Sequence, residues 1–239
     1  MLSSGHVAVS YQQVVSLIIP SASVLPEAEK MIQMNNRMLY HFKRLVFAIS
    51  PRMAENMGVD FRMNLPNRVF LEKQIFGFMN SSAYGLKDRK CLFVGIKRYN
   101  WHYHRLLDFD YYSIDSNPKE AKYGTNGKHT VGSVLELCDY FDENSFQFVI
   151  ANGLIGFGIN DEISSNKMFT QIHRVLKNEG ILILGYNEQS SRLTFKLESS
   201  AGFSLFDRFT PAIRGLTDEP YMINDDSNHC YIFLKKVIA

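Results

Sequence analysis

The sequence has few cysteines and no long apolar run. Its three cysteines, Cys91, Cys138 and Cys230, share no close spacing, so they predict neither a disulfide framework nor a metal site. No apolar stretch approaches the roughly 20 residues that span a bilayer. No Lys or Arg precedes Lys30, which disfavours a signal peptide. We therefore expect a cytoplasmic protein with reduced thiols, no bound metal and no membrane partner.

An excess of charge of one sign is also missing. The chain has 26 Lys and Arg against 24 Asp and Glu, for a net charge of +2. Without a basic stripe, the sequence does not predict a nucleic-acid partner. Its 239 residues and 46% apolar content are sufficient for a buried core in one globular domain, with a small appendage.

Residues 1–88 predict a helical extension or lid. Apolar side chains recur in steps of three and four from Glu27 to Ile49, which is typical of an amphipathic helix. A second helix is predicted from Arg68 to Met79. These N-terminal helices are also the candidate contact for a homodimer.

Residues 89–239 show a different period. Short apolar strands are predicted at Cys91–Gly95, Tyr111–Asp115 and Phe146–Gly153, and polar loops and helical segments separate them. A helix is predicted from Asp161 to Leu176, and a further strand follows it. This alternation predicts an α/β fold with a doubly wound, mostly parallel sheet, which holds nucleotide-type cofactors at the carboxyl edge of its strands.

Smaller elements complete the prediction. We expect helices at Asn100–Leu107, at the segment VLELCDYF that begins at Val134, and at Ser190–Ser199. Gly180 is a plausible C-cap for the helix that ends near Leu176. The remaining strands are expected at His129–Val131 and in a closing pair, Phe203–Phe209 with Cys230–Val237.

Two motifs carry a family resemblance. The segment Phe169–Asn187 contains R-V-L-K-N-E-G between a helix and a strand, similar to a helix, R-V-L-K-P-G-G, strand element. The segment Asp142–Phe157 is similar to a fourth-strand motif, F-D-x-V followed by a short polar loop. In this order they make Cys91–Val237 resemble the class I S-adenosylmethionine-dependent methyltransferases. The resemblance implies a seven-stranded, Rossmann-like sheet, S-adenosyl-L-methionine as cofactor and methyl transfer as activity.

The glycine-rich motif of that family is degenerate. In place of G-x-G-x-G the chain has G-I-K-R-Y, and only Gly95 remains. Glycines there let the backbone approach the cofactor. Lys97 or Arg98 is a candidate partner for the cofactor carboxylate; the alternative is that both are solvated loop charges.

Asp115 is the strongest cofactor candidate. It ends the second strand twenty residues after Gly95, which is the spacing of a ribose-binding acid in nucleotide folds. Ser116 would then lie beside the adenosine. The alternative is that Asp115 caps the turn before Pro118.

The resemblance assigns three further residues. Ser133 matches the family's adenine-contacting position, although it could equally cap the following helix. Asn152 and Gly153 fall where cofactor and acceptor meet in the family, although Asn-Gly is also a common turn pair.

The aromatic segment after the first strand supplies the acceptor-site candidates. Tyr99, Trp101 and Tyr103 are candidate substrate contacts, because aromatic rings can wall a pocket. His102 and His104 are candidate general bases. The alternative is that these side chains belong to the core or the surface. No pattern gives His229, which precedes the last strand, a particular role.

These patterns favour an S-adenosylmethionine-dependent methyltransferase acting on a small molecule. The alternative is a methyltransferase-like scaffold or interaction domain without catalysis, which the degenerate glycine motif would suit. A nicotinamide-dependent oxidoreductase ranks last because the chain lacks a G-x-G-x-x-G turn.

Overall fold

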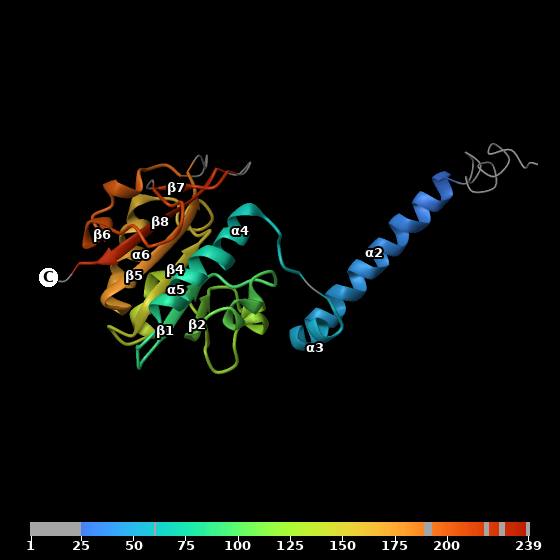
Figure 1. Cartoon of the computed structure of the whole chain (residues 1–239), viewed down its shortest axis with the longest axis horizontal. Helices are drawn as coiled ribbons and strands as arrows, with labels where there is room; N and C mark the ends of the chain where they lie inside the picture. Colours follow the sequence, from blue (N-terminus) through green and yellow to red (C-terminus); the bar gives the residue numbers. More distant parts are fainter. Residues whose placement is uncertain (1–24, 60, 189–192, 218–219, 225–227, 238–239) are drawn as a thin grey trace, which may run out of the picture. The chain divides into compact units, whose positions relative to one another are not determined.

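The computed structural model describes residues 25–239 except 60, 189–192, 218–219, 225–227 and 238–239. Its chain divides into two compact units, Met1–Asp60 and Phe61–Ala239, which are coloured along the sequence in Figure 1.

The described part of the first unit is helical. Helix α2 (Leu25–Ile49) confirms the predicted amphipathic helix, and the short α3 (Pro51–Asn56) follows it. Ser50 separates the two: its Oγ accepts a hydrogen bond from the Met53 N–H at 3.2 Å, and Pro51 occupies the first turn. Both features are typical helix-start signals.

An eight-stranded sheet forms the centre of the second unit. The strand order is β3-β2-β1-β4-β5-β8-β6, and β7 pairs with β8. Strands β1 to β5 run parallel, whereas β8 is antiparallel to β5 and to β6. The strands are β1 (Lys90–Val94), β2 (Asp110–Asp115), β3 (His129–Val131), β4 (Phe146–Asn152), β5 (Leu176–Asn187), β6 (Phe206–Arg208), β7 (Tyr221–Met222) and β8 (His229–Lys236). The doubly wound, mostly parallel sheet is confirmed, and the two-residue β7 is one strand more than expected.

One face of the sheet is covered by a continuous helical segment. It comprises α4 (Pro66–Phe70), a π-helical turn η1 (Leu71–Ile75) and α5 (Phe76–Ser82). Its buried side chains join those of β1, β4, β5 and β8 in one hydrophobic cluster. This helical segment belongs to the same compact unit as the sheet, which begins at Phe61. The predicted domain boundary after residue 88 stays a prediction.

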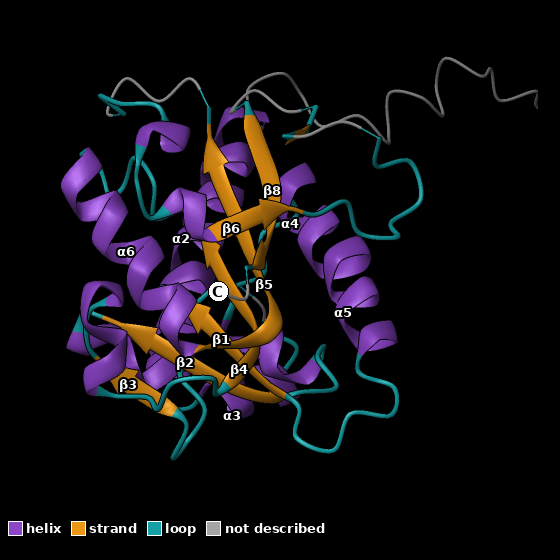
Figure 2. Ribbon diagram, turned by 90° about the vertical axis from the view of Figure 1, so that its left-hand side faces the viewer, coloured by secondary structure: helices purple, strands orange, loops and turns teal. Residues whose placement is uncertain are grey.

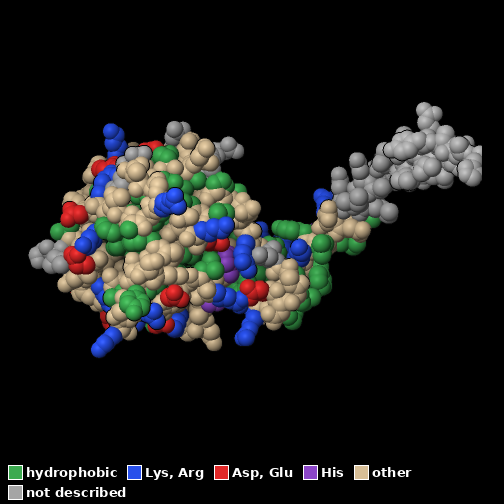
Figure 3. Space-filling view, viewed as in Figure 1, with side chains coloured by type: hydrophobic (Ala, Val, Ile, Leu, Met, Phe, Trp, Pro, Cys, Tyr) green, Lys and Arg blue, Asp and Glu red, His purple; other side chains and the backbone are tan. Residues whose placement is uncertain are grey.

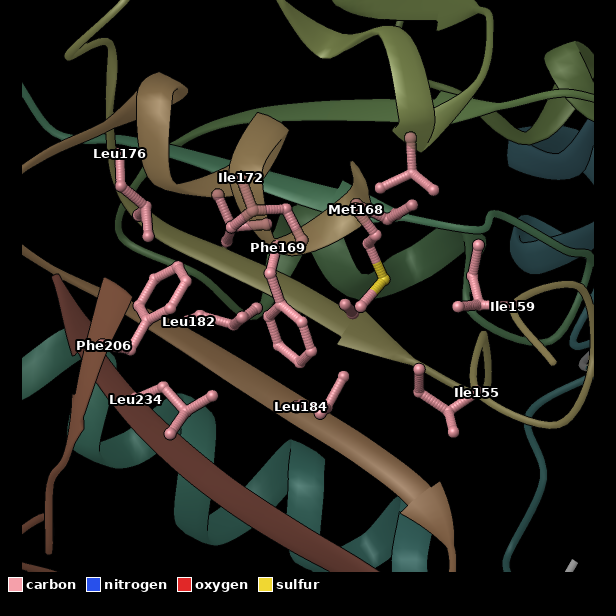
Figure 4. Close-up of a cluster of buried hydrophobic side chains, with 14 of the residues drawn as sticks. Ile155, Ile159, Met168, Phe169, Ile172, Leu176, Leu182, Leu184, Phe206 and Leu234 are labelled. Carbon is pink, nitrogen blue, oxygen red and sulfur yellow. The ribbon is translucent and has the colours of Figure 1, made fainter. Parts of the chain in front are cut away.

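Helix α6 (Glu162–Val175) covers the opposite face, as Figure 2 shows. Figure 4 shows Met168 and Phe169 pointing from α6 toward Leu182 and Leu184 of β5, and all four are fully buried. These two layers of buried side chains, one on each face, hold the edges of the sheet in fixed positions.

The end of α6 corrects one expectation. The helix stops at Val175, and β5 begins at once with Leu176. Gly180 is therefore not a C-cap but lies within β5, where the pairing with β4 shifts register. A Cβ at Gly180 would lie 2.7 Å from the carbonyl oxygen of Lys177, so this irregularity requires glycine.

The shorter predicted helices form 3-10 turns, namely η2 (Trp101–Arg105), η4 (Val134–Asp139) and η5 (Leu197–Ser199). Two further 3-10 turns are η3 (Pro118–Tyr123) and η6 (Phe203–Leu205), and η6 takes up the first three residues of the predicted strand Phe203–Phe209. Part of the predicted helix Ser190–Ser199 lies outside the described residues, and its described end contains only η5. The closing antiparallel pair is confirmed as β6 and β8. None of the described helices is both long enough and apolar enough for a membrane crossing.

A pair of glycine substitutions tests the packing of α6. Gly202 lies so close to α6 that a Cβ would be 2.7 Å from the Asn166 carbonyl oxygen and 2.8 Å from the Phe169 Cβ. We expect Gly202→Ala to lower the free energy of unfolding by about 1–3 kcal/mol, the usual effect of overpacking. Urea denaturation measures it.

Gly77→Ala is the matched control. Gly77 lies within α5, and a Cβ there meets no atom within 4 Å. Since alanine is more favourable than glycine in a helix interior, this substitution should raise the free energy of unfolding by up to about 1 kcal/mol. Equal destabilisation by the two substitutions would contradict the close approach at Gly202.

Candidate functional site

Three parallel strands bring the ends of three sequence segments together. Val94 of β1 pairs with Ile114 of β2 on one side and with Ala151 of β4 on the other. The chain therefore leaves the sheet at neighbouring points of the same edge. From β1 the chain continues to β2 and β3 on one side of the sheet and then crosses to β4 and β5 on the other side. The strand order therefore reverses between β1 and β4. In α/β folds such a topological switch point is where ligands bind.

A cavity of about 190 Å³ opens at this point. Four of the sequence-predicted cofactor residues, Gly95, Asp115, Ser116 and Ser133, line it. The rest of its lining is mostly apolar: Val94, Ile114, Gly132, Val134, Leu135, Leu154, Phe157, Gly158 and Ile159. The structure thus assembles one carboxylate, two hydroxyl groups and apolar walls at the carboxyl edge of the sheet.

Asp115 is buried and caps the turn, which is one of its two predicted roles. Its Oδ1 accepts a hydrogen bond from the Asn117 N–H at 2.8 Å, which is the turn-capping interaction. Its Oδ2 lies 4.0 Å from Lys97 Nζ. Since each carboxylate oxygen accepts more than one hydrogen bond, capping the turn leaves Asp115 able to accept hydrogen bonds from ribose hydroxyls.

The loop after β1 adopts a conformation in which only its first residue must be glycine. Gly95 has φ +86°, whereas no other residue of the loop has a positive φ. The buried Asn100 side chain closes the loop: its Oδ1 accepts from the Lys97 N–H at 2.7 Å, and its Nδ2 donates to the Gly95 carbonyl at 3.1 Å. Side chains at Lys97, Arg98 and Tyr99 are therefore compatible with the backbone.

Ser133 caps the following helical turn, which is one of its two sequence interpretations. Its Oγ accepts a hydrogen bond from the Leu135 N–H at 3.1 Å and so caps η4. The same residue lines the smaller cavity. Contact of Ser133 with adenine stays a prediction.

A second cavity, of about 510 Å³, adjoins the first. Phe157 lines both, whereas Asn152 and Gly153 line only the larger one. The described residues that line the larger cavity are Leu65, Pro66, Asn67, Arg68, Asn152, Gly153, Phe157, Asn187, Asn224 and His229. The carboxyl edge of the sheet therefore presents two neighbouring sites of different character.

Tyr231 holds Asn152 in place beneath the larger cavity. Asn152 Nδ2 donates to the Tyr231 hydroxyl at 3.3 Å, and this hydroxyl donates to the Asn67 carbonyl oxygen at 3.0 Å. Asn152 Oδ1 is buried and accepts no hydrogen bond from the described residues. A Cβ on Gly185 would lie 2.5 Å from this oxygen, so a glycine in β5 makes room for the amide.

His229 is a site residue that the sequence patterns did not indicate. It starts β8 directly opposite Asn187, the last residue of β5. Its Nδ1 lies 2.7 Å from Asn187 Oδ1, and an Nδ1–H donated to this oxygen leaves the lone pair on Nε2. A neutral imidazole of this tautomer can accept a proton at Nε2.

Comparison with known proteins identifies the architecture. The N-methyltransferase NodS from Bradyrhizobium japonicum WM9, in complex with S-adenosyl-L-homocysteine, superposes with a TM-score of 0.54 and 10% identity over 73% of this chain and 90% of NodS. A second NodS structure gives 0.52 and 9% over 73% of this chain and 99% of NodS. This chain has the Rossmann-like methyltransferase fold. No protein-family model and no curated protein matches the sequence.

Within the methyltransferase fold, Lys97 interacts with the chain's own carboxylates. Its Nζ lies 3.3 Å from Glu120 Oε1 and 4.0 Å from Asp115 Oδ2, and it lines neither cavity. Because the Lys97 side chain is 39% exposed, water screens its ion pair with Glu120, which is therefore weak. Pairing of Lys97 with the cofactor carboxylate stays a prediction.

The predicted aromatic substrate contacts lie beside the cavities rather than in their lining. The Arg68 guanidinium carbon is 4.9 Å from the centroid of the Tyr99 ring. Trp101 is buried, and Tyr103 is fully buried in the core cluster of α5 and β1. Burial raises the pKa of the Tyr103 phenol. Direct substrate contact by Tyr99, Trp101 and Tyr103 stays a prediction.

The two predicted bases also lie outside both linings. His102 is buried with its Nε2 3.3 Å from Glu72 Oε1, and His104 Nδ1 is 2.7 Å from the Trp101 carbonyl oxygen. Their catalytic role stays a prediction, and their positions favour His229 over both. Among the described residues, no group of three His, Cys, Asp or Glu side chains is arranged to hold a metal ion.

Substitution of Asn100 tests the closure of the cofactor loop. Asn100→Ala leaves the Lys97 N–H and the Gly95 carbonyl without their partner, which should lower the free energy of unfolding by about 1–3 kcal/mol. Hydrogen exchange at the Lys97 amide should accelerate. Asn100→Asp keeps the acceptor for this amide and should preserve its protection; unchanged exchange in Asn100→Ala would refute the closure.

The tautomer of His229 tests the second part of the site. We expect ¹⁵N chemical shifts of the imidazole at neutral pH to show a protonated Nδ1 and an unprotonated Nε2, because Nδ1 faces Asn187 Oδ1. Asn187→Ala should shift the tautomer population toward Nε2–H. The exposed His41 serves as the reference. A protonated Nε2 in the unaltered protein would rule out His229 as a base of the kind described.

Proposed function

We propose that this chain is an S-adenosyl-L-methionine-dependent methyltransferase that acts on a small-molecule acceptor. One observation carries the proposal: two cavities that share Phe157 lie side by side at the switch point of a methyltransferase fold. The smaller one would hold the adenosyl part of the cofactor, and the larger one would hold the acceptor.

The lining of the smaller cavity suits an adenosyl group. Asp115 offers carboxylate oxygens for ribose hydroxyls, and Ser116 and Ser133 add polar groups for the adenosine. Its apolar side chains, such as Ile114 and Leu154, provide walls for a flat base. When bound, S-adenosyl-L-methionine supplies a methyl group on a sulfonium, which an acceptor lone pair displaces to leave S-adenosyl-L-homocysteine.

The larger cavity provides groups for the acceptor. Asn152, held by Tyr231, can orient an acceptor N–H or O–H through its buried Oδ1. His229 Nε2 can take the proton that the acceptor releases. Much of the rate of such a displacement comes from alignment and exclusion of water, so few catalytic side chains are required.

The surface and the size of the cavity favour a small acceptor over a nucleic acid. Figure 3 shows basic and acidic side chains interspersed over the visible face of the unit Phe61–Ala239. A volume of about 510 Å³ lies within the usual range of about 300–1,000 Å³ for small-molecule sites. A cytoplasmic location and a homodimer formed through the N-terminal helices complete the proposal as predictions from the sequence.

One observation favours the alternative, a non-catalytic methyltransferase-like module. Lys97, where the family has a glycine, is engaged by Glu120 and Asp115 and so reduces the negative charge available to a ribose. Such a module would bind neither the cofactor nor its product, and a binding experiment separates the two functions.

Isothermal titration calorimetry with S-adenosyl-L-methionine and S-adenosyl-L-homocysteine tests the proposal. Asp115→Asn should weaken both affinities by about 10- to 100-fold, because hydrogen bonds to a charged acceptor are lost. Asp110→Asn is the matched control, since Asp110 lies at the other end of β2 and outside both cavities. Absence of binding at millimolar concentrations would favour the non-catalytic module, and equal affinities in the two variants would remove the ribose assignment.

A further inference from the structure

The described residues that line the larger cavity have an unbalanced charge. Among them, Arg68 is the one with a permanent charge, and none is acidic. The remaining polar side chains are four asparagines and His229, all of which can donate or accept hydrogen bonds without adding negative charge. A ligand that brings a negative charge would balance this lining.

Arg68 is positioned but not neutralised by the protein. It forms no ion pair with a carboxylate in the part of the chain that the structure describes, and its Nη1 is buried without a hydrogen-bond partner there. Its guanidinium carbon lies 4.9 Å from the centroid of the Tyr99 ring, within cation–π range. Burial opposes the charge, but Tyr103, Tyr99 and Tyr231 outweigh it and raise the pKa of Arg68.

Two amide oxygens of residues in the same lining lack a hydrogen-bond donor among the described residues. Asn67 Oδ1 and Asn152 Oδ1 are both buried and accept no hydrogen bond from the described residues. Asn152 cannot simply turn away, because its Nδ2 is engaged by the Tyr231 hydroxyl. An unsatisfied buried oxygen requires an explanation, and an N–H or O–H group supplied by a ligand of this cavity is the one that the neighbouring Arg68 favours.

We propose that the acceptor is a small carboxylic acid that also carries an amino or hydroxyl group. Its carboxylate pairs with Arg68, and its N–H or O–H group faces the asparagine oxygens. The proposal rests on the methyltransferase function and adds the chemical class of the acceptor. A carboxylate fits better than a phosphate because one planar guanidinium matches the two oxygens and the single charge of a carboxylate.

The direction of transfer follows from this arrangement. The amino or hydroxyl group is the nucleophile: its lone pair forms the new bond to the methyl carbon, and the carbon–sulfur bond breaks with its electrons going to sulfur. The proton that the nucleophile loses goes to Nε2 of His229, which lines the same cavity. The carboxylate takes no part in bond making and serves as the anchor.

Ligand binding to the larger cavity is measurable without turnover. The probes are anthranilate, its neutral analogue anthranilamide, benzoate and phenyl phosphate, each titrated at millimolar concentration and followed by ¹H–¹⁵N NMR shifts at Gly153 and Asn187. Anthranilate should bind about 10- to 100-fold more tightly than anthranilamide, the usual effect of a charge-assisted hydrogen bond. Benzoate, which lacks the donor group, should bind more weakly than anthranilate.

Variants of Arg68 test whether this residue causes the preference for anthranilate over anthranilamide. Arg68→Gln should abolish the preference for the acid over the amide, and Arg68→Lys, which keeps the charge without the planar fork, should restore part of it. Arg105→Gln is the control, because Arg105 also packs on an aromatic ring, that of Trp101, but lines neither cavity. Circular dichroism establishes that each variant is folded.

The outcomes separate this inference from the proposed function. Cofactor binding in Arg68→Gln should be unchanged, since Arg68 does not line the smaller cavity. Suppose that the protein binds the cofactor but does not bind anthranilate, or binds anthranilate and anthranilamide equally. This result overturns the acid acceptor and leaves the methyltransferase function intact. A preference for phenyl phosphate, or an equal loss in Arg105→Gln, also overturns the acid acceptor. Acid binding without any cofactor binding would overturn the methyltransferase function and leave an acid-binding cavity.

Discussion

The pairing of Val94 with both Ile114 and Ala151 is the constraint on which the site depends. Because β1 is hydrogen-bonded in parallel to a strand on each side, the residues that follow all three strands emerge at one edge. Helices α5 and α6 cover opposite faces of the sheet, and the smaller cavity opens at this edge. Gly95, Asp115 and Ser116 reach the cavity through this register, and Ser133 reaches it through the pairing of β3 with β2.

The sequence was sufficient for the parts of the fold that are locally determined. Buried parallel strands appear as short apolar runs, and Asp115 could be assigned because it ends one of them at a nucleotide-fold spacing. Short helices were less predictable: one or two turns carry too few periodic positions to separate α from 3-10, as at Trp101–Arg105. Gly180 misled because a glycine after a helix suits a C-cap and a strand irregularity equally.

The larger cavity could not be assembled from local patterns. Arg68, Asn152 and His229 are far apart in the sequence and meet because helix α4 and strand β8 both approach the end of β4. An antiparallel closing strand does carry one usable signal: its first residue must lie near the last residue of its neighbour, as His229 does with Asn187. The aromatic segment after β1 contained more candidate site residues than any other segment. Tyr103 is nevertheless buried in the core, because a large ring gains more free energy from burial than from lining a polar cavity.

The polar atoms of the larger cavity bear on why such a site is retained. Asn67 Oδ1, Arg68 Nη1 and Asn152 Oδ1 are buried without partners among the described residues, and each such atom lowers stability by about 1–3 kcal/mol. The apolar cores on the two faces of the sheet can offset this loss. Tyr231 and Tyr99 hold Asn152 and Arg68 in place, so the groups are oriented before a ligand arrives. A ligand that satisfies them therefore gains the interactions without the entropy loss of ordering them.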